Sequence, residues 1–190
     1  SNKGGAQLRE QVIAKRYARA LFSIGQEKGS DELKTYGQQL AQLAEVLREA
    51  PQLVRLFRNP IVRVEHKKGV VTALLDKLEV TGTVRQFCHF LADRERLANF
   101  LEIQEYFSRL LDANEGILRG RLVTAIELTK TKQDQIAKKL EKQLKGQLVL
   151  NYETDTSILG GLVLKVGDKV YDASLRAQLD QMRETIKRGE

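Results

Sequence analysis

The sequence contains few of the residues that mark disulfide-rich, metal-binding or membrane-spanning proteins. Its 190 residues include one cysteine, two prolines, two histidines and no tryptophan. A single cysteine, Cys88, forms no internal disulfide, which fits a reducing compartment. No apolar run approaches the roughly 20 residues that a bilayer-spanning helix needs. The opening residues 1–10 also lack the apolar core of a secretory signal, so we expect none.

The charged residues are numerous but evenly mixed. Apolar residues make up 42% and charged residues 30%, which predicts a helix-rich globular protein rather than a disordered one. The net charge of +7 is compatible with nucleic acid, an anionic surface or an acidic protein partner. However, the basic residues form no block of like charge and no aromatic residues interleave with them. A nucleic-acid footprint is normally clustered, so the pattern argues against one.

Periodicity predicts helices in the first part of the chain and a mixture of strands and helices in the second. Apolar residues recur every three or four positions, with Gly29, Pro51 and Pro60 as breaks, and indicate six helices. These helices are expected at 8–28, 31–49, 52–58, 64–78, 84–92 and 97–113. Runs of helices followed by strands and helices favour two domains, here 1–115 and 116–190.

The second part is predicted to follow a β-α-β-β-β-α order. Alternating apolar residues indicate strands at 118–128, 148–153 and 162–166, with a lysine-rich amphipathic helix at 129–144. Gly167-Asp168 suits a hairpin turn into a short return strand, and a closing helix is expected over 175–186, capped by Asp172 or Ser174. The fold class is therefore α+β: a six-helix bundle followed by a small α/β domain with a mixed sheet and two helices.

The sequence contains no recognisable catalytic or metal-binding motif. Cys88 and His89 are adjacent on a helix and point about 100° apart, so they do not share a metal ion easily. Asp93, Glu95 and Arg96 read either as an acid pair with a clamp or, more simply, as a solvated corner. An enzyme is the weakest class, because no acid, base and nucleophile come together in any recognisable spacing.

Apolar side chains on two helices exceed what a small surface helix needs. They are Tyr17, Leu21 and several alanines on the first helix, and Val84, Phe87, Phe90 and Leu91 on the fifth. An apolar groove between two helices is the usual receptor for an amphipathic helix. The alternative, that these residues are simply the core of the bundle, remains open from the sequence.

Four segments carry a family resemblance. They are Ala14–Phe22 (AKRYARALF), Asn59-Pro60, Leu91–Leu97 (LADRERL), and the stretch ILGGLVLKVGD at 158–168 with YDASL at 171–175. Together they resemble the delta subunit of bacterial and chloroplast F-type ATP synthases, whose mitochondrial counterpart is the oligomycin-sensitivity-conferring protein. The likeness covers about residues 8–186. The charged corner at 93–96 departs mildly from the family pattern.

The resemblance implies a non-catalytic tether of the peripheral stalk, without cofactor, metal or nucleic acid. The N-terminal domain would bind the N-terminal helix of an alpha subunit on the catalytic head, in a groove between the first and fifth helices. The C-terminal domain would hold the C-terminal region of the b subunits, so that the head does not rotate with the central stalk. The groove residues carried over are Ala14, Tyr17, Ala18, Leu21, Val84, Phe87 and Leu91.

The same resemblance implies one copy per complex and a peripheral position, without membrane insertion, at the cytoplasmic face of a bacterial inner membrane; chloroplast and mitochondrion are the alternatives. A different class stays open beside it: a basic RNA- or ribosome-associated module that uses the helix at 129–145. Affinity that falls steeply with salt would indicate nucleic acid.

Overall fold

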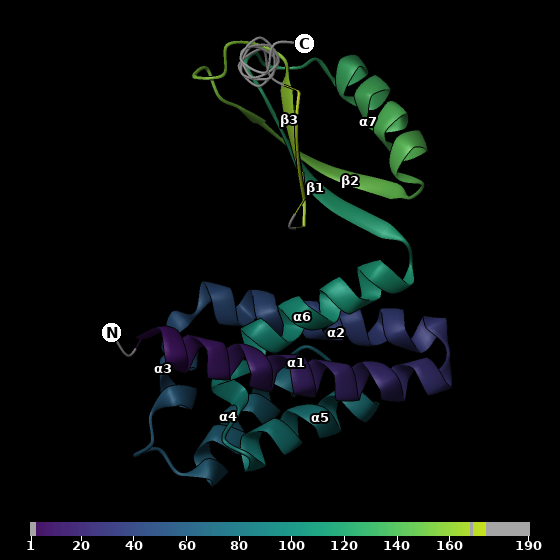
Figure 1. Cartoon of the computed structure of the whole chain (residues 1–190). Helices are drawn as coiled ribbons and strands as arrows, with labels where there is room; N and C mark the ends of the chain where they lie inside the picture. The colour runs from purple at the N-terminus through teal and green to yellow at the C-terminus, as the bar shows by residue number, and fades with distance from the viewer. Residues whose placement is uncertain (1–2, 168, 174–190) are drawn as a thin grey trace. The chain divides into compact units, whose positions relative to one another are not determined.

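Residues 3–167 and 169–173 are described by the computed structural model (Figure 1). The chain divides into two compact units, Ser1–Leu111 and Asp112–Glu190, and the dividing point lies inside the last helix of the bundle. The α+β fold class is confirmed: seven α-helices and a four-stranded mixed sheet lie within the described residues. None of the described helices combines the length and apolarity that crossing a membrane requires.

The N-terminal unit is built from six helices, as the periodicity predicts. They are α1 (Lys3–Lys28), α2 (Ser30–Glu49), α3 (Pro51–Arg58), α4 (Val64–Lys77), α5 (Gly82–Asp93) and α6 (Phe100–Asn114). A 3₁₀ turn, η1 (Leu97–Asn99), stands where the sequence predicts the start of the sixth helix, because the Asn99 N–H bonds back three residues to the Arg96 carbonyl. Gly29 separates α1 from α2 at a φ of 114°, which few other residues adopt.

The core of this unit lies where the apolar stripes of the helices meet. Phe22 of α1 and Phe107 of α6 pack edge to face with ring centroids 5.7 Å apart. Leu40 of α2, Leu75 of α4 and Leu91 of α5 are fully buried around them. Burial of each such side chain contributes about 1.5–3 kcal/mol. Among the described residues, most of the buried apolar side chains belong to this bundle.

Helices α4 and α5 end in the same way, and ion pairs join them. Glu79 and Glu95 follow the two helices at φ values of 55° and 53°. The backbone N–H of the residue after each glutamate donates to the carbonyl five residues earlier. Each end is therefore a Schellman motif with glutamate in the left-handed position where glycine is usual. The two carboxylates of the charged corner are paired: Lys67 bonds to Glu95 at 3.3 Å and Lys68 to Asp93 at 2.9 Å. Both carboxylates remain exposed, so the corner is solvated as expected, and their ion pairs also form a clamp between α4 and the end of α5.

The C-terminal unit is a sheet with strand order β2-β1-β3-β4. Its elements are β1 (Ile117–Thr124), α7 (Lys130–Leu144), β2 (Gln147–Thr154), β3 (Leu162–Val166) and β4 (Lys169–Asp172). The β1 and β2 strands are parallel and joined by α7, whereas β3 and β4 add antiparallel, which makes the sheet mixed as predicted.

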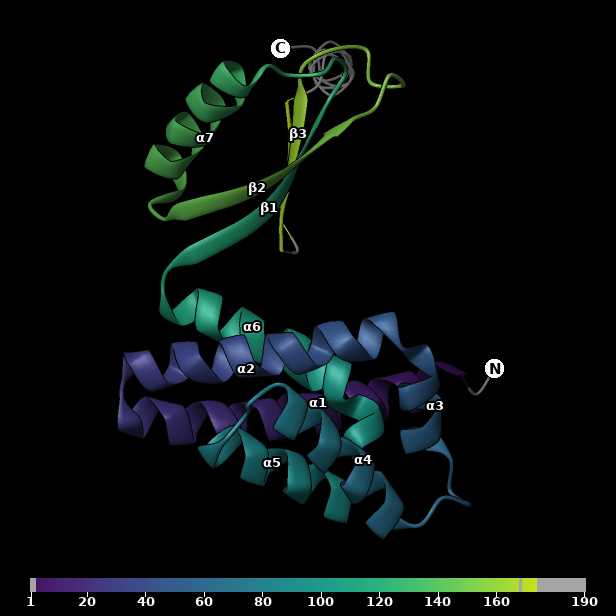
Figure 2. The same ribbon diagram turned by 180° about the vertical axis from the view of Figure 1, so that it is seen from behind.

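The register places Leu122, Tyr152 and Leu164 side by side on one face. The Tyr152 hydroxyl donates to the Gln133 carbonyl of α7 at 3.1 Å, so α7 lies on that face, alongside β2 in both views (Figures 1 and 2). The first strand is shorter than predicted. It ends at Thr124, whose hydroxyl donates to the Ile126 carbonyl and turns the chain away.

The predicted hairpin joins β3 and β4, with Gly167 at a φ of 57°. Asp168 of that turn and the predicted closing helix at 175–186 lie outside the described residues.

Candidate functional site

Helices α1 and α5 lie next to each other and run in opposite directions. Lys28, at the end of α1, donates to the Thr83 hydroxyl near the start of α5 at 3.0 Å. Eleven residues earlier on α1, Tyr17 meets Phe90 near the end of α5, with ring centroids 6.0 Å apart. Both views of the ribbon show the two helices side by side (Figures 1 and 2). The pair predicted to form a groove is therefore adjacent in the bundle.

Most of the predicted groove residues belong to the core. On α1, Ala14, Ala18 and Leu21 are at most 2% exposed. On α5, the residues concerned, Val84, Phe87 and Leu91, are buried as well. These six side chains set the spacing of the helices, and the two alanines allow neighbouring helices to approach closely. They are not available to touch a partner in this conformation, so the core interpretation that the sequence left open applies to them.

Tyr17 differs from the other six because it is only partly buried and packs against the core from its edge. It belongs to a second stripe on α1, made of Ile13, Tyr17, Ala20 and Ile24, next to the buried stripe. Ile24 is 43% exposed, and Phe90 on α5 is 44% exposed. We call Ile13, Tyr17, Ala20, Ile24 and Phe90 the α1–α5 face. It is an apolar surface that its own bundle leaves partly uncovered.

Arginines stand over both aromatic rings of this face. The Arg16 guanidinium lies 5.7 Å from the centroid of Tyr17, and that of Arg94 lies 5.3 Å from Phe90. These distances are within the range of cation–π attraction. The arrangement places two positive charges beside an apolar surface. A helix that is apolar on one side and carries carboxylates at its margins would complement it.

The titratable groups near this face are not set up for catalysis. Burial raises the pKa of the Cys88 thiol to about 12, so the nucleophilic thiolate is scarce at neutral pH. Burial, with Arg85 and Lys68 nearby, lowers the pKa of His89, whose Nε2 lies 3.0 Å from the Thr72 hydroxyl. Within residues 3–167 and 169–173, no group of three or more potential ligands gathers as a metal site requires.

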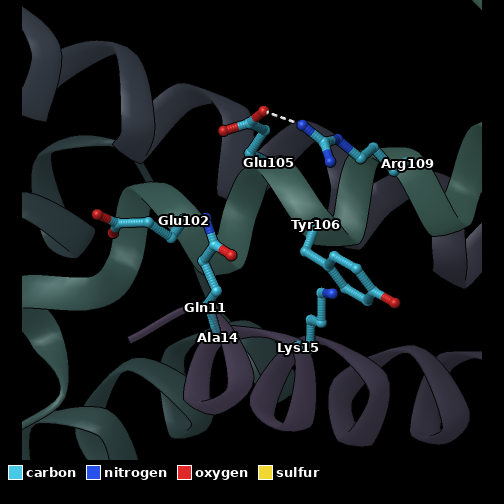
Figure 3. Close-up of a pocket in the computed structure, with 7 residues that line it drawn as sticks. All are labelled: Gln11, Ala14, Lys15, Glu102, Glu105, Tyr106 and Arg109. Carbon is cyan, nitrogen blue, oxygen red and sulfur yellow. Dashed lines mark hydrogen bonds and ion pairs between the residues drawn. The ribbon is translucent and has the colours of Figure 1, made fainter. Parts of the chain in front are cut away.

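A separate hollow of about 180 Å³ lies between α1 and α6 (Figure 3). Its lining residues are Gln11, Ala14, Lys15, Glu102, Glu105, Tyr106 and Arg109. Arg109 is tied to Glu105, and Lys15 lies over the Tyr106 ring at 5.7 Å (Figure 3). Ala14 thus borders α6, whereas Tyr17 borders α5. Glu105 and Arg109 form the one ion pair among the described residues of this lining, whereas the buried Oε2 atom of Glu102 accepts no hydrogen bond from the described residues.

The C-terminal unit exposes both basic and apolar side chains. The lysines of α7 and its end, at positions 130, 132, 138, 139, 142 and 145, are all exposed. Ile126, Leu159, Val170 and Tyr171 are also exposed, each by 44% or more. Scattered apolar side chains are common on protein surfaces, so the row of exposed lysines on α7 is the stronger reason to treat this unit as a second candidate for partner contact.

Sequence reasoning misses part of the α1–α5 face. It places Phe90 and Ala20 among the candidate apolar residues but not among the groove residues, and it assigns Ile13 and Ile24 only to the helix pattern. A signal is nevertheless present: α1 carries two parallel stripes, and a helix buried on one side needs only one. Which stripe faces the core depends on the other helices, and the sequence of α1 does not contain that information.

Comparison with known proteins identifies the class. The family model described as ATP synthase delta (OSCP) subunit matches residues 13–186. A solved relative, in the cryo-EM structure of the Toxoplasma gondii mitochondrial ATP synthase hexamer, has the same fold, with a TM-score of 0.68 and 22% identity. That match covers 92% of this chain and 97% of the other.

Curated relatives give the particular family member to which the chain is similar. "ATP synthase subunit delta" of Nitratidesulfovibrio vulgaris strain DP4 is 54% identical over 94% of this chain and 98% of its own length. The protein of the same name from Oleidesulfovibrio alaskensis is 51% identical over the same shares, and that from Lawsonia intracellularis is 41% identical over 94% and 95%. The chain belongs to the ATP synthase delta (OSCP) subunit family.

Proposed function

We propose that this chain is a non-catalytic tether in the peripheral stalk of an F-type ATP synthase. Its N-terminal unit binds the N-terminal helix of an alpha subunit on the α1–α5 face. Its C-terminal unit binds the C-terminal region of the b subunits, and one copy serves each complex. Held in this way, the catalytic head does not turn with the central stalk. Family membership supports the role, and the partly uncovered apolar face supports the first contact.

The α1–α5 face has the features that a helix-binding surface needs. Its apolar residues follow α1 over Ile13, Tyr17 and Ile24 and continue across to Phe90, so they form a strip about three helical turns long. Covering a few hundred Å² of such a strip gains about 25 cal/mol per Å² before the cost of ordering the peptide. Because six of the residues carried over from the family are core, this strip is the surface on which contact depends.

The test compares charge substitutions on and off this face in the full chain. Phe90→Asp and Tyr17→Asp each replace an apolar contact with a carboxylate that the bound helix would bury. Ser23→Asp adds the same charge to the same helix at an exposed position off the stripe and is the matched control. Affinity for a labelled peptide from the alpha N-terminus is measured by fluorescence anisotropy, with helicity checked by circular dichroism.

Both face variants should bind at least about tenfold more weakly, since losing one apolar anchor costs about 1.5–3 kcal/mol and about 1.4 kcal/mol is a factor of ten. Ser23→Asp should bind like the parent. If all three variants bind the peptide as tightly as the parent protein does, with helicity retained, the α1–α5 face is removed from the proposal. Weak binding by Ser23→Asp as well would show that the effect is charge alone.

The proposed contact with the b subunits rests on the C-terminal unit. Its basic α7 and its exposed apolar residues suit an amphipathic stalk end that carries acidic side chains. The position of the protein follows from these contacts: it is peripheral, on the cytoplasmic face of a bacterial inner membrane, where the catalytic head lies. Co-purification of the full chain with a fragment from the C-terminal end of the b protein tests this; no complex in low salt would contradict it.

A further inference from the structure

A second apolar groove lies on the bundle, away from the α1–α5 face. It is formed where the end of α2 meets α3 and the start of α6, and it encloses about 420 Å³. Its lining residues are Leu47, Arg48, Pro51, Val54, Arg55, Arg58 and Leu101. None of these belongs to α1 or α5, and the two surfaces share no residue. We call this site the α3 groove.

The floor and the rim of the α3 groove differ in chemistry. Leu47, Val54 and Leu101 form an apolar floor, of which Leu47 is fully in the core. Three arginines stand at the rim, and none of the described residues that line it is a carboxylate. An apolar floor favours apolar side chains, whereas the planar guanidinium fork favours carboxylates, which it binds with two parallel hydrogen bonds.

Two of the rim arginines lack an ion-pair partner within the described part of the chain. They are Arg55 and Arg58, whereas Arg85, Arg109 and other arginines do form ion pairs. The third, Arg48, donates to the Gln104 side chain at 2.9 Å. The positive charge of the rim is therefore available to an acidic partner, and its attraction to a carboxylate would increase when a partner excludes water from the groove.

The spacing of the rim favours a helical partner. Arg55 and Arg58 are three residues apart on α3 and so lie on one side of that helix, one turn from each other. Carboxylates three or four residues apart on a second helix have a matching separation, and apolar residues between them would enter the floor. A polyphosphate or nucleic acid would satisfy the arginines but would leave the apolar floor exposed to water, so it fits less well.

We infer that the α3 groove is a second docking site, which takes an acidic amphipathic helical segment of a partner subunit in the assembled synthase. The segment presents apolar side chains to Val54 and Leu101 and carboxylates to Arg55 and Arg58. This inference does not depend on what the α1–α5 face binds. With two such sites on different helices, the bundle would hold two segments at once, and each attachment would raise the effective concentration of the other.

The experiment uses photo-crosslinking in the purified, assembled synthase. A benzoylphenylalanine replaces Gln52, an exposed residue three positions before Arg55 on α3, so that Arg55 and Arg58 both remain, and in a control it replaces Arg63, an exposed residue that does not line the groove. After irradiation, the attached segment is identified by mass spectrometry. Each substitution is made with and without Arg55→Glu, which reverses one rim charge, and assembly of every variant is checked by gel filtration.

The expected result is an adduct from position 52 with a partner segment that carries carboxylates and apolar residues at helical spacing. Its yield should fall at least about tenfold with Arg55→Glu, because attraction becomes repulsion, and any adduct from position 63 should be unaffected. Three results would overturn the inference: no adduct from position 52 in the intact complex, an adduct with a lipid or a segment without carboxylates, or a yield that does not change with Arg55→Glu.

Discussion

The two glutamates in left-handed conformation make it possible to measure how much the Lys67–Glu95 ion pair of the clamp contributes to the free energy of unfolding. Glu79 and Glu95 occupy equivalent positions in two Schellman motifs, at φ values of 55° and 53°. They differ in one respect: Glu95 holds the ammonium of Lys67, which is only 2% exposed, whereas no ion pair to Glu79 exists among the described residues. Replacing either glutamate with glycine therefore relieves the same backbone strain, but only the replacement of Glu95 also removes an ion pair.

Glu79→Gly should stabilise the protein. A left-handed conformation costs a side-chain-bearing residue about 1–2 kcal/mol, and glycine avoids this while it loses about 0.5–1 kcal/mol more chain entropy on folding. The expected net gain in the free energy of unfolding is about 0.5–1 kcal/mol, the difference between these two effects.

Glu95→Gly has the same gain but removes the partner of a buried ammonium. Leaving a buried polar or charged group unsatisfied costs about 1–3 kcal/mol or more. Because the Glu95 side chain is 56% exposed, solvent already screens the pair and the lower part of this range applies. We expect Glu95→Gly to lie about 1–2 kcal/mol below Glu79→Gly in the free energy of unfolding.

Repeating both substitutions in a Lys67→Met background completes the cycle. Methionine fills a similar volume without charge, and replacing a buried ion pair with apolar groups is often neutral or stabilising. The gap between the two glycine variants should then disappear. Urea unfolding followed by far-ultraviolet circular dichroism measures all six proteins, and equal m-values show that the same transition is compared. If Glu95→Gly matches Glu79→Gly in the Lys67 protein, the ion pair contributes nothing and the argument fails.

Three further outcomes follow from single side chains. Cys88, buried and with its pKa raised to about 12, should not react with Ellman's reagent at about pH 8 until urea unfolds the bundle; immediate reaction would show that α5 opens in the native state. Burial lowers the pKa of His89, so this residue binds a proton more readily in the unfolded chain than in the folded one. The free energy of unfolding should therefore fall as the pH drops below about 6.5. His89→Gln should lessen that fall, as measured by urea titrations at about pH 7.5 and about pH 5.5. Gly120→Ala puts a methyl group 2.9 Å from Val166 Cγ2, and we expect this crowding to destabilise the sheet by about 1–3 kcal/mol. Hydrogen exchange should then be faster in β1 and β3 and unchanged in α1 to α5.

The helices were predictable because each carries a local signal of its own. Gly29 and Pro51 mark boundaries that the structure places within a residue, and the strand pattern at 162–166 is reproduced without change. The strand expected to reach Leu128 ends at Thr124, whose hydroxyl donates to the Ile126 carbonyl two residues later, a local contact that apolar alternation does not reveal. The charges at 93–96 predict a solvated corner, and Asp93 and Glu95 are indeed exposed. Their ion pairs were not predictable, because only the position of α4 shows that Lys67 and Lys68 meet them.

The candidate site shows the same limit of prediction from the sequence. A sequence pattern reports which residues on α1 are apolar, but two apolar stripes on different sides of one helix cannot both face one core. Ala14, Ala18 and Leu21 are buried because the neighbouring helices pack on their side of α1, whereas Tyr17 is only partly buried and packs against the core. The stripe that faces the core is therefore set by the positions of the other helices, which the sequence of α1 alone does not contain. In the proposed contact, Ala20, the small exposed member of the outer stripe, is where a partner helix would approach α1 most closely, between Tyr17 and Ile24.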